Sequence, residues 1–154
     1  MVYAVVRVRG TVNVKPNIKR TLQLLRLTRV NHCVLLEEND VYKGMIQIIK
    51  DYVTWGEIDK ETLTKLITKR GMLSGDKPVN VEYLKASTSY ESIEKLSAAI
   101  LDNSITYKEL PDVKPLFRLN PPKQGYGTIK RTFAKGGTLG YRKKEINALI
   151  TRML

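Results

Sequence analysis

The fold of this chain is decided near its start, by the stretch Val2-Tyr3-Ala4-Val5-Val6-Arg7-Val8-Arg9. Its β-branched residues and its alternation predict a strand. Successive side chains of a strand point to opposite faces. We therefore expect the even-numbered residues, all apolar, on one face and the odd-numbered ones, which include Arg7 and Arg9, on the other.

Helical and extended patterns alternate after this strand. Pro16 suits the first turn of a helix, and Ile18, Leu22 and Leu25 recur at helical spacing, so residues 16–28 predict an amphipathic helix. A strand, a second helix and a third strand are predicted to follow at 33–36, 41–52 and from residue 53 onward. The order β-α-β-α-β indicates a compact α/β unit over residues 1–58.

Helices are also predicted in the middle of the chain. Asp59 can cap a helix over 60–70, and Gly71 can close it. The residues from Thr88 resemble a capping box, which predicts another helix over 89–102. A helical region is therefore expected over 59–112.

The last part of the chain, 113–154, follows a different pattern. Four of the six prolines lie in 111–122, which forbids a continuous helix there and predicts an extended path. Apolar residues at helical spacing mark a final helix, beginning near Ile146. The sequence thus divides into 1–58, 59–112 and 113–154.

Basic residues dominate 113–144, which holds nine Lys and Arg and no acid. Four aromatic residues and five glycines lie among them. Basic charge supplies affinity for a phosphate backbone, aromatic rings can stack on unpaired bases, and glycines permit close approach. We expect this stretch to lie against RNA, and not DNA, because no helix-turn-helix or finger pattern is present.

The whole chain carries a net charge of +12, distributed unevenly. Residues 1–30 hold seven Lys or Arg and no acid, 31–112 hold ten against fourteen acids, and 113–154 hold ten against one. Such an excess favours a polyanionic partner. The two basic ends are therefore expected to form the interaction surface.

A membrane partner is not expected. No apolar run approaches the length of a membrane span, the N-terminus lacks a signal-peptide pattern, and the most basic stretch is too rich in Gly and Pro for one amphipathic helix. A single cysteine permits no internal disulfide, which fits a reducing cytoplasm.

Catalytic chemistry is weakly supported. The only histidine and the only cysteine, His32 and Cys33, are adjacent, so on a strand they point apart and cannot act as a base and nucleophile pair. They are too few for an ordinary zinc site. We expect Cys33 to pack in the core, and His32 either to be structural or to touch RNA. The glycine-rich stretches at 125–127 and 136–140 match no nucleotide-binding motif. No enzyme activity, metal, cofactor or small-molecule substrate is predicted.

Three stretches resemble one known family. The first has Thr21-Leu22, Leu25, Leu27, Arg29, His32 and Val34, then Met45-Ile46, Ile49 and Tyr52-Val53. The second is Tyr52-Val53-Thr54-Trp55-Gly56-Glu57. The third has Phe117-Arg118-Leu119-Asn120-Pro121-Pro122, Gly127-Thr128-Ile129-Lys130-Arg131 and Gly136-Gly137-Thr138-Leu139-Gly140-Tyr141-Arg142.

These stretches resemble the large-subunit ribosomal protein thirty family, whose eukaryotic member is called protein seven. The length resembles archaeal members. The sequence departs from the family pattern at four places. His is common where Asn120 stands, Pro where Thr132 stands and Gly where Lys143 stands, and an acidic residue is frequent where Lys19-Arg20 stands.

The resemblance implies an α+β fold: a ferredoxin-like unit with three antiparallel strands and two helices. It also implies a structural, non-catalytic role in the cytoplasmic ribosome, where the chain would bind large-subunit ribosomal RNA near the 5S RNA and meet neighbouring ribosomal proteins. The alternatives are a non-ribosomal RNA chaperone, or a ribosome-assembly or RNA-processing factor.

We expect RNA contacts from two sets of residues. The set near the N-terminus is Arg7, Arg9, Lys15, Lys19, Arg26, Arg29 and His32. The set near the C-terminus is Arg118, Lys123, Tyr126, Lys130, Arg131, Phe133, Lys135, Gly136, Gly137, Tyr141, Arg142, Lys143 and Lys144.

Overall fold

A five-stranded sheet organises the protein, seen in a computed structural model that describes all residues from 1 to 154. Its strands are β1 (Val2–Arg7), β2 (His32–Glu37), β3 (Val53–Glu57), β4 (Phe117–Arg118) and β5 (Gly140–Tyr141). They lie in the order β4-β2-β1-β3-β5. β1 pairs antiparallel with β2 on one side and with β3 on the other, so it is the central strand.

The chain also forms six α-helices. They are α1 (Pro16–Leu24), α2 (Asp40–Ile49), α3 (Lys60–Arg70), α4 (Val81–Ser87), α5 (Ile93–Leu101) and α6 (Ile146–Met153). Short 3-10 helices are η1 (Tyr107–Glu109), η2 (Phe133–Lys135) and η3 (Lys143–Glu145). None of the helices is long and apolar enough to span a bilayer.

β1 is buried on both faces and separates two hydrophobic clusters. Val2, Ala4 and Val6 belong to the larger cluster, and Tyr3 and Val5 belong to the smaller one. This division confirms the alternation predicted from the sequence. Each fully buried valine contributes roughly 1.5–3 kcal/mol of transfer free energy. A strand with both faces covered is therefore a strong determinant of this fold.

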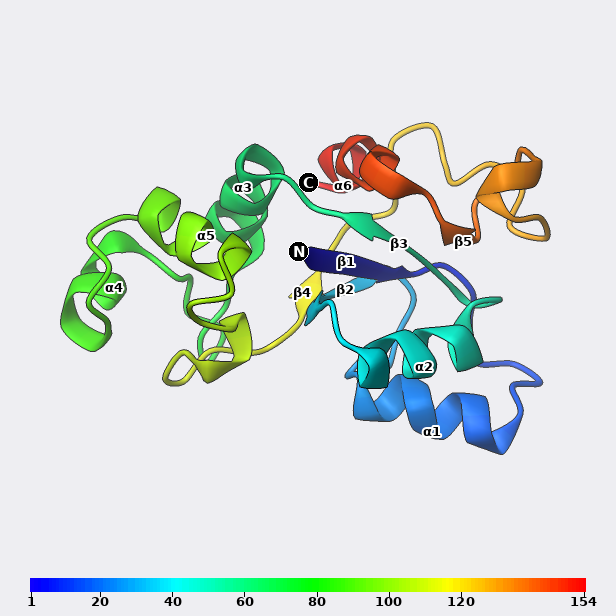
Figure 1. Cartoon of the computed structure of the whole chain (residues 1–154), viewed down its shortest axis with the longest axis horizontal. Helices are drawn as coiled ribbons and strands as arrows, with labels where there is room; N and C mark the ends of the chain where they lie inside the picture. Colours follow the sequence, from blue (N-terminus) through cyan, green and yellow to red (C-terminus); the bar gives the residue numbers. More distant parts are fainter.

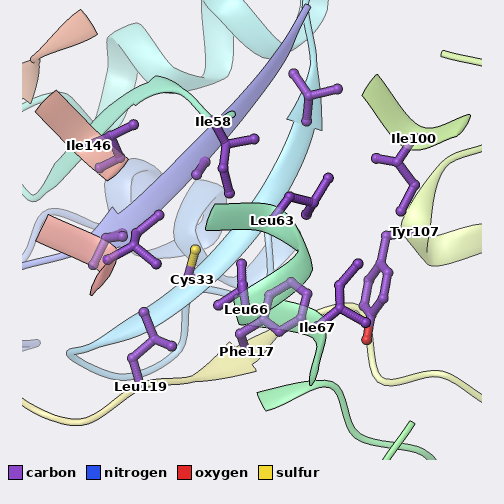
Figure 2. Packing of buried hydrophobic residues seen from close by; sticks show 14 of the residues in the cluster. Cys33, Ile58, Leu63, Leu66, Ile67, Ile100, Tyr107, Phe117, Leu119 and Ile146 are labelled. Atoms are coloured by element: carbon purple, nitrogen blue, oxygen red, sulfur yellow. The ribbon is translucent and has the colours of Figure 1, made fainter. Parts of the chain in front are cut away.

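The helices form a layer on each face of the sheet. α1 and α2 cover one face, while α3 and α6 lie on the other (Figure 1). The larger cluster joins Leu63, Leu66 and Ile67 of α3 to Cys33 of β2 and Phe117 of β4, as Figure 2 shows. The predicted packing of Cys33 in the core is confirmed.

Several helix boundaries differ from the prediction. α1 ends at Leu24 and not at residue 28, because Arg26 adopts a left-handed φ of 61° and the Leu27 amide then donates to the Leu22 carbonyl over 2.8 Å. This 6→1 hydrogen bond closes a Schellman motif. Leu27 is thereby turned inward and fully buried.

In the middle of the chain, the helix over 60–70 is confirmed, with the Asp59 side chain accepting from the Thr62 amide. α4 was not predicted. α5 begins at Ile93 and not at residue 89, because Ser92 and not Thr88 accepts the capping hydrogen bond, from the Lys95 amide.

The predicted α/β class and the three central antiparallel strands are confirmed, but the sheet is larger than expected. The C-terminal segment adds β4 beside β2 and β5 beside β3, the latter in parallel. β4 lies within 111–122 and no helix forms over these residues, so the predicted absence of a continuous helix there is confirmed. The division at residues 58 and 112 stays a prediction, and the larger cluster includes residues from all three segments.

We predict that Gly56→Ala destabilises the fold by about 3 kcal/mol, because a Cβ at Gly56 would overlap the Lys143 carbonyl oxygen where β3 passes η3. Gly44→Ala is the matched control, since nothing lies near its added Cβ and α2 should gain about 0.5–1 kcal/mol from helix propensity. Urea unfolding measures both. Equal effects of the two substitutions would contradict the close approach.

Candidate nucleic-acid interface

A compact loop over residues 123–139 leads into β5 and carries much of the basic charge. The loop is held by its own backbone: the Gly137 amide donates to the Thr132 carbonyl over 2.7 Å, and the Phe133 amide donates to the Leu139 carbonyl over 2.7 Å. An added Cβ at Gly137 would overlap the Arg131 carbonyl, so this position requires glycine. The loop therefore has a defined shape that presents its cations.

Six cations of this region are exposed and have no carboxylate within 4.0 Å. We call them the C-terminal cation group: Lys123, Lys130, Arg131, Lys135, Lys143 and Lys144. Arg118 is different, because its Nη1 lies 3.5 Å from the Asp76 carboxylate. Cations without internal partners are available to neutralise phosphates.

A second set lies near the N-terminus. We call Lys15, Lys19, Arg26 and Arg29 the N-terminal cation group; all four are exposed and none has an ion pair. Arg9 is half-buried, with its guanidinium 5.3 Å from the centre of the Tyr52 ring. The loop before α1 and the loop before β5 both project from the right-hand end of the molecule in Figure 1.

Three predicted RNA contacts, Arg7, Arg142 and His32, lie inside the protein. Arg7 is 2% exposed and donates to the Leu27 carbonyl over 2.7 Å and to the Arg9 carbonyl over 2.9 Å. Its guanidinium is thus used to hold the connection between α1 and β2. A guanidinium without surface cannot reach a phosphate, so the interface omits Arg7.

Arg142 is also buried and fixes the basic loop to the sheet. Its Nε donates to the Thr54 hydroxyl over 2.8 Å, its Nη2 donates to the Thr138 carbonyl over 2.7 Å, and its guanidinium lies 4.8 Å from the centre of the Phe133 ring. Burial lowers the Arg142 pKa to about 10. We therefore assign Arg142 to positioning the loop, a role that its sequence context of basic neighbours did not indicate.

The three aromatic residues predicted to stack on RNA bases differ in how much of the ring is exposed. Tyr126 is half-buried and its hydroxyl donates to the Asn31 side chain, so it packs inward. Phe133 is 37% exposed and Tyr141 is 42% exposed. The Tyr141 hydroxyl donates to Glu57, which raises the Tyr141 pKa to about 12. Phe133 and Tyr141 are the aromatic rings that present surface to a base.

His32 and Cys33 are both buried. The His32 Nδ1 lies 3.5 Å from the Thr28 hydroxyl, and burial raises the pKa of the Cys33 thiol to about 12. A thiol with such a pKa stays protonated and is a poor nucleophile.

One positioning residue was missed from the sequence. The Arg152 Nη1 donates to the Lys123 carbonyl over 3.1 Å and to the Gly125 carbonyl over 3.2 Å, which ties the start of the loop to α6. The sequence places Arg152 in an amphipathic helix, and nothing in that pattern predicts its hydrogen bonds to the loop. Arg20, an exposed cation of α1, was also left out of the predicted set.

Comparisons with known proteins agree on one family. Residues 3–53 match the family described as Ribosomal protein L30p/L7e. The chain is 49% identical over 152 residues to a protein of Methanosphaera stadtmanae, covering 99% of both chains. It is 52% identical over 156 residues to a protein of Methanococcus vannielii, covering all of both, and 48% identical over 151 residues to one of Methanocorpusculum labreanum. Each of these relatives is named Large ribosomal subunit protein uL30.

We predict that Arg142→Met destabilises the protein by about 2–3 kcal/mol, because it removes charged hydrogen bonds and leaves the Thr138 carbonyl buried without a partner. Lys135→Met is the matched control and should change the free energy of unfolding by less than about 0.5 kcal/mol, since Lys135 is exposed. Thermal or urea unfolding without RNA measures both. A stable Arg142→Met protein would contradict the positioning role.

His32 should make stability depend on pH. Burial, aided by the nearby charge of Arg118, lowers the His32 pKa below its ordinary 6.5, so the unfolded chain takes up a proton before the folded protein does. The contribution of neutral His32 to the free energy of unfolding is therefore fully present above about pH 6.5, and it is lost as the pH falls through the pKa of His32 in the folded protein.

Because His32 is the only histidine, His32→Gln should flatten the loss of unfolding free energy between about pH 7 and 5. The measurement is urea unfolding across that range. Identical pH profiles for the two proteins would show that His32 does not titrate differently on folding.

Proposed function

This chain belongs to the ribosomal protein L30p/L7e family, and from that premise we propose that it is a structural, non-catalytic constituent of the large ribosomal subunit. It binds ribosomal RNA in the ribosome of the cytoplasm and supports the folded RNA during translation. The proposal is supported by relatives near 50% identity that match the chain along its whole length.

The observation that carries RNA binding is the C-terminal cation group. Its six side chains are exposed and none has an internal carboxylate partner. Four of them lie on the loop over 123–139, which Arg142 fixes to the sheet, and Lys143 and Lys144 follow Arg142 directly. Fixed cations lose less conformational entropy on binding than cations of a disordered tail. They would neutralise phosphates, while Phe133 and Tyr141 offer ring surface for stacking.

The N-terminal cation group supports a second contact, since its four cations are also exposed and unpaired. Both groups include cations on loops that project from the same end of the molecule (Figure 1). We propose that one folded region of ribosomal RNA touches both. Placement near the 5S RNA is part of this proposal and is supported by the family resemblance alone.

We predict that the triple variant Lys130/Arg131/Lys135→Glu weakens binding to large-subunit RNA. The slope of log K against the logarithm of the salt concentration should also become shallower by about 3, because each phosphate contact contributes about one to that slope. The measurement is a titration of purified protein with RNA at several salt concentrations.

The matched control changes the same charge elsewhere: Lys50/Lys69/Lys85→Glu replaces three exposed cations that have no ion pair and lie on α2's end, α3 and α4. It should weaken binding much less. If both triple variants lose affinity equally, the binding depends on net charge and the loop has no special role.

A further inference from the structure

The outer edge of β2 is unpaired along most of its length. β4 pairs only with His32 and Cys33, so Val34–Glu37 have β1 on one side and no strand on the other. No backbone hydrogen bond outside the β1 ladder involves these four residues. In an antiparallel strand, alternate residues point N–H and C=O away from the paired neighbour. The edge thus carries free donors and acceptors at regular spacing.

The reason for the gap is the path of the chain before β4. Continuing the ladder would place Leu116 opposite Val34 and Pro115 opposite Leu35, but proline has no N–H to donate. The Lys114 amide instead donates to the Met72 carbonyl over 2.9 Å, and Val113 bridges to Leu73. In Figure 1 the segment before β4 turns away from β2 toward the helices α4 and α5.

A trough of about 400 Å³ lies along this edge. All four residues Val34–Glu37 line it. One wall includes Leu25 and Tyr42, and the other includes Tyr107 and Val113. Most of the lining is hydrophobic. Apolar walls on both sides of a bare strand edge suit a strand whose side chains alternate between the two walls.

Charges at the trough select the kind of strand that fits. Arg26 and Lys108 both line it, and neither has a carboxylate within 4.0 Å. The Lys108 ammonium donates a hydrogen bond to the Tyr42 hydroxyl over 2.8 Å. Glu37 is the only acid in the lining. With two cations and one acid, the lining carries a net charge of +1, which complements an apolar segment that carries Asp or Glu.

We propose that an extended, partly acidic segment of another protein adds a strand antiparallel to β2 at Val34–Glu37. RNA fits less well, because its backbone offers no alternating amide donors and carbonyl acceptors, and the walls are apolar. An exposed apolar strand edge tends to pair with other chains, and monomeric proteins usually cover such an edge or place charges on it. A bound strand from another protein would therefore explain why Val34–Glu37 have no neighbouring strand within this chain on that side. The proposal deepens the proposed function, in that the neighbour would be a second protein of the same particle.

The test uses large subunits purified through a tag on this chain, with Leu24→p-benzoylphenylalanine as the photocrosslinker. Leu24 lines the trough, is exposed and is not one of the cations that select the strand. We expect a crosslink to one segment of another protein. Lys85→p-benzoylphenylalanine, on exposed α4 outside the trough, is the control and should not reach that segment. A crosslink to RNA, to a second copy of this chain, or to nothing would overturn the proposal.

Hydrogen exchange on the same particles separates a paired strand from mere proximity. The outward amides of Val34–Glu37 should exchange about 100-fold or more slowly in the subunit than in the free protein. Unchanged exchange would overturn the proposal even if a crosslink formed. Recovery of large-subunit RNA with the tagged chain is scored separately, so failure of the proposed function is distinguished from failure of this inference.

Discussion

Burial of β1 on both faces is the constraint on which the rest of the structure depends. Its apolar residues divide between two clusters, so the sheet must be covered by helices on each side. α1 and α2 supply one layer, and α3 and α6 supply part of the other (Figure 1). The second layer would be incomplete without the C-terminal segment, because Phe117, Ile146, Leu149 and Ile150 all belong to the larger cluster. The same segment that carries the basic charge therefore completes the core.

This double role explains how a loop rich in glycine and cations can have a defined shape. Buried Arg142 links Thr54 of β3 to the Thr138 carbonyl, and Arg152 links α6 to the start of the loop. Exposed lysines and arginines then project from a fixed backbone. The arrangement separates two uses of arginine: those with buried guanidinium groups hold the fold, and those without internal partners remain for phosphates.

Sequence reasoning recovered the features that depend on periodicity and capping. The β1 alternation and the Asp59-capped α3 were predicted because both have local signals. β4 and β5 were not predicted, since a strand of two residues has no period to detect and its pairing depends on distant residues. The burial of Arg7 and Arg142 was missed for a similar reason: their partners are carbonyl and hydroxyl groups brought close only by the fold. At Lys143, where the family pattern favours glycine, the structure has a left-handed φ of 51°, which explains that preference.

The central claim is that this chain is a structural component of the large ribosomal subunit, and sedimentation tests it most directly. A cell extract would be run through sucrose gradients at moderate and at high salt, and the protein located in each fraction. We expect one copy per particle in the large-subunit peak at moderate salt and weaker retention at high salt, because the exposed cations bind phosphates of the folded RNA and that attraction falls with salt. Presence only in light fractions, or release at moderate salt, would contradict the account and favour a chaperone or processing factor.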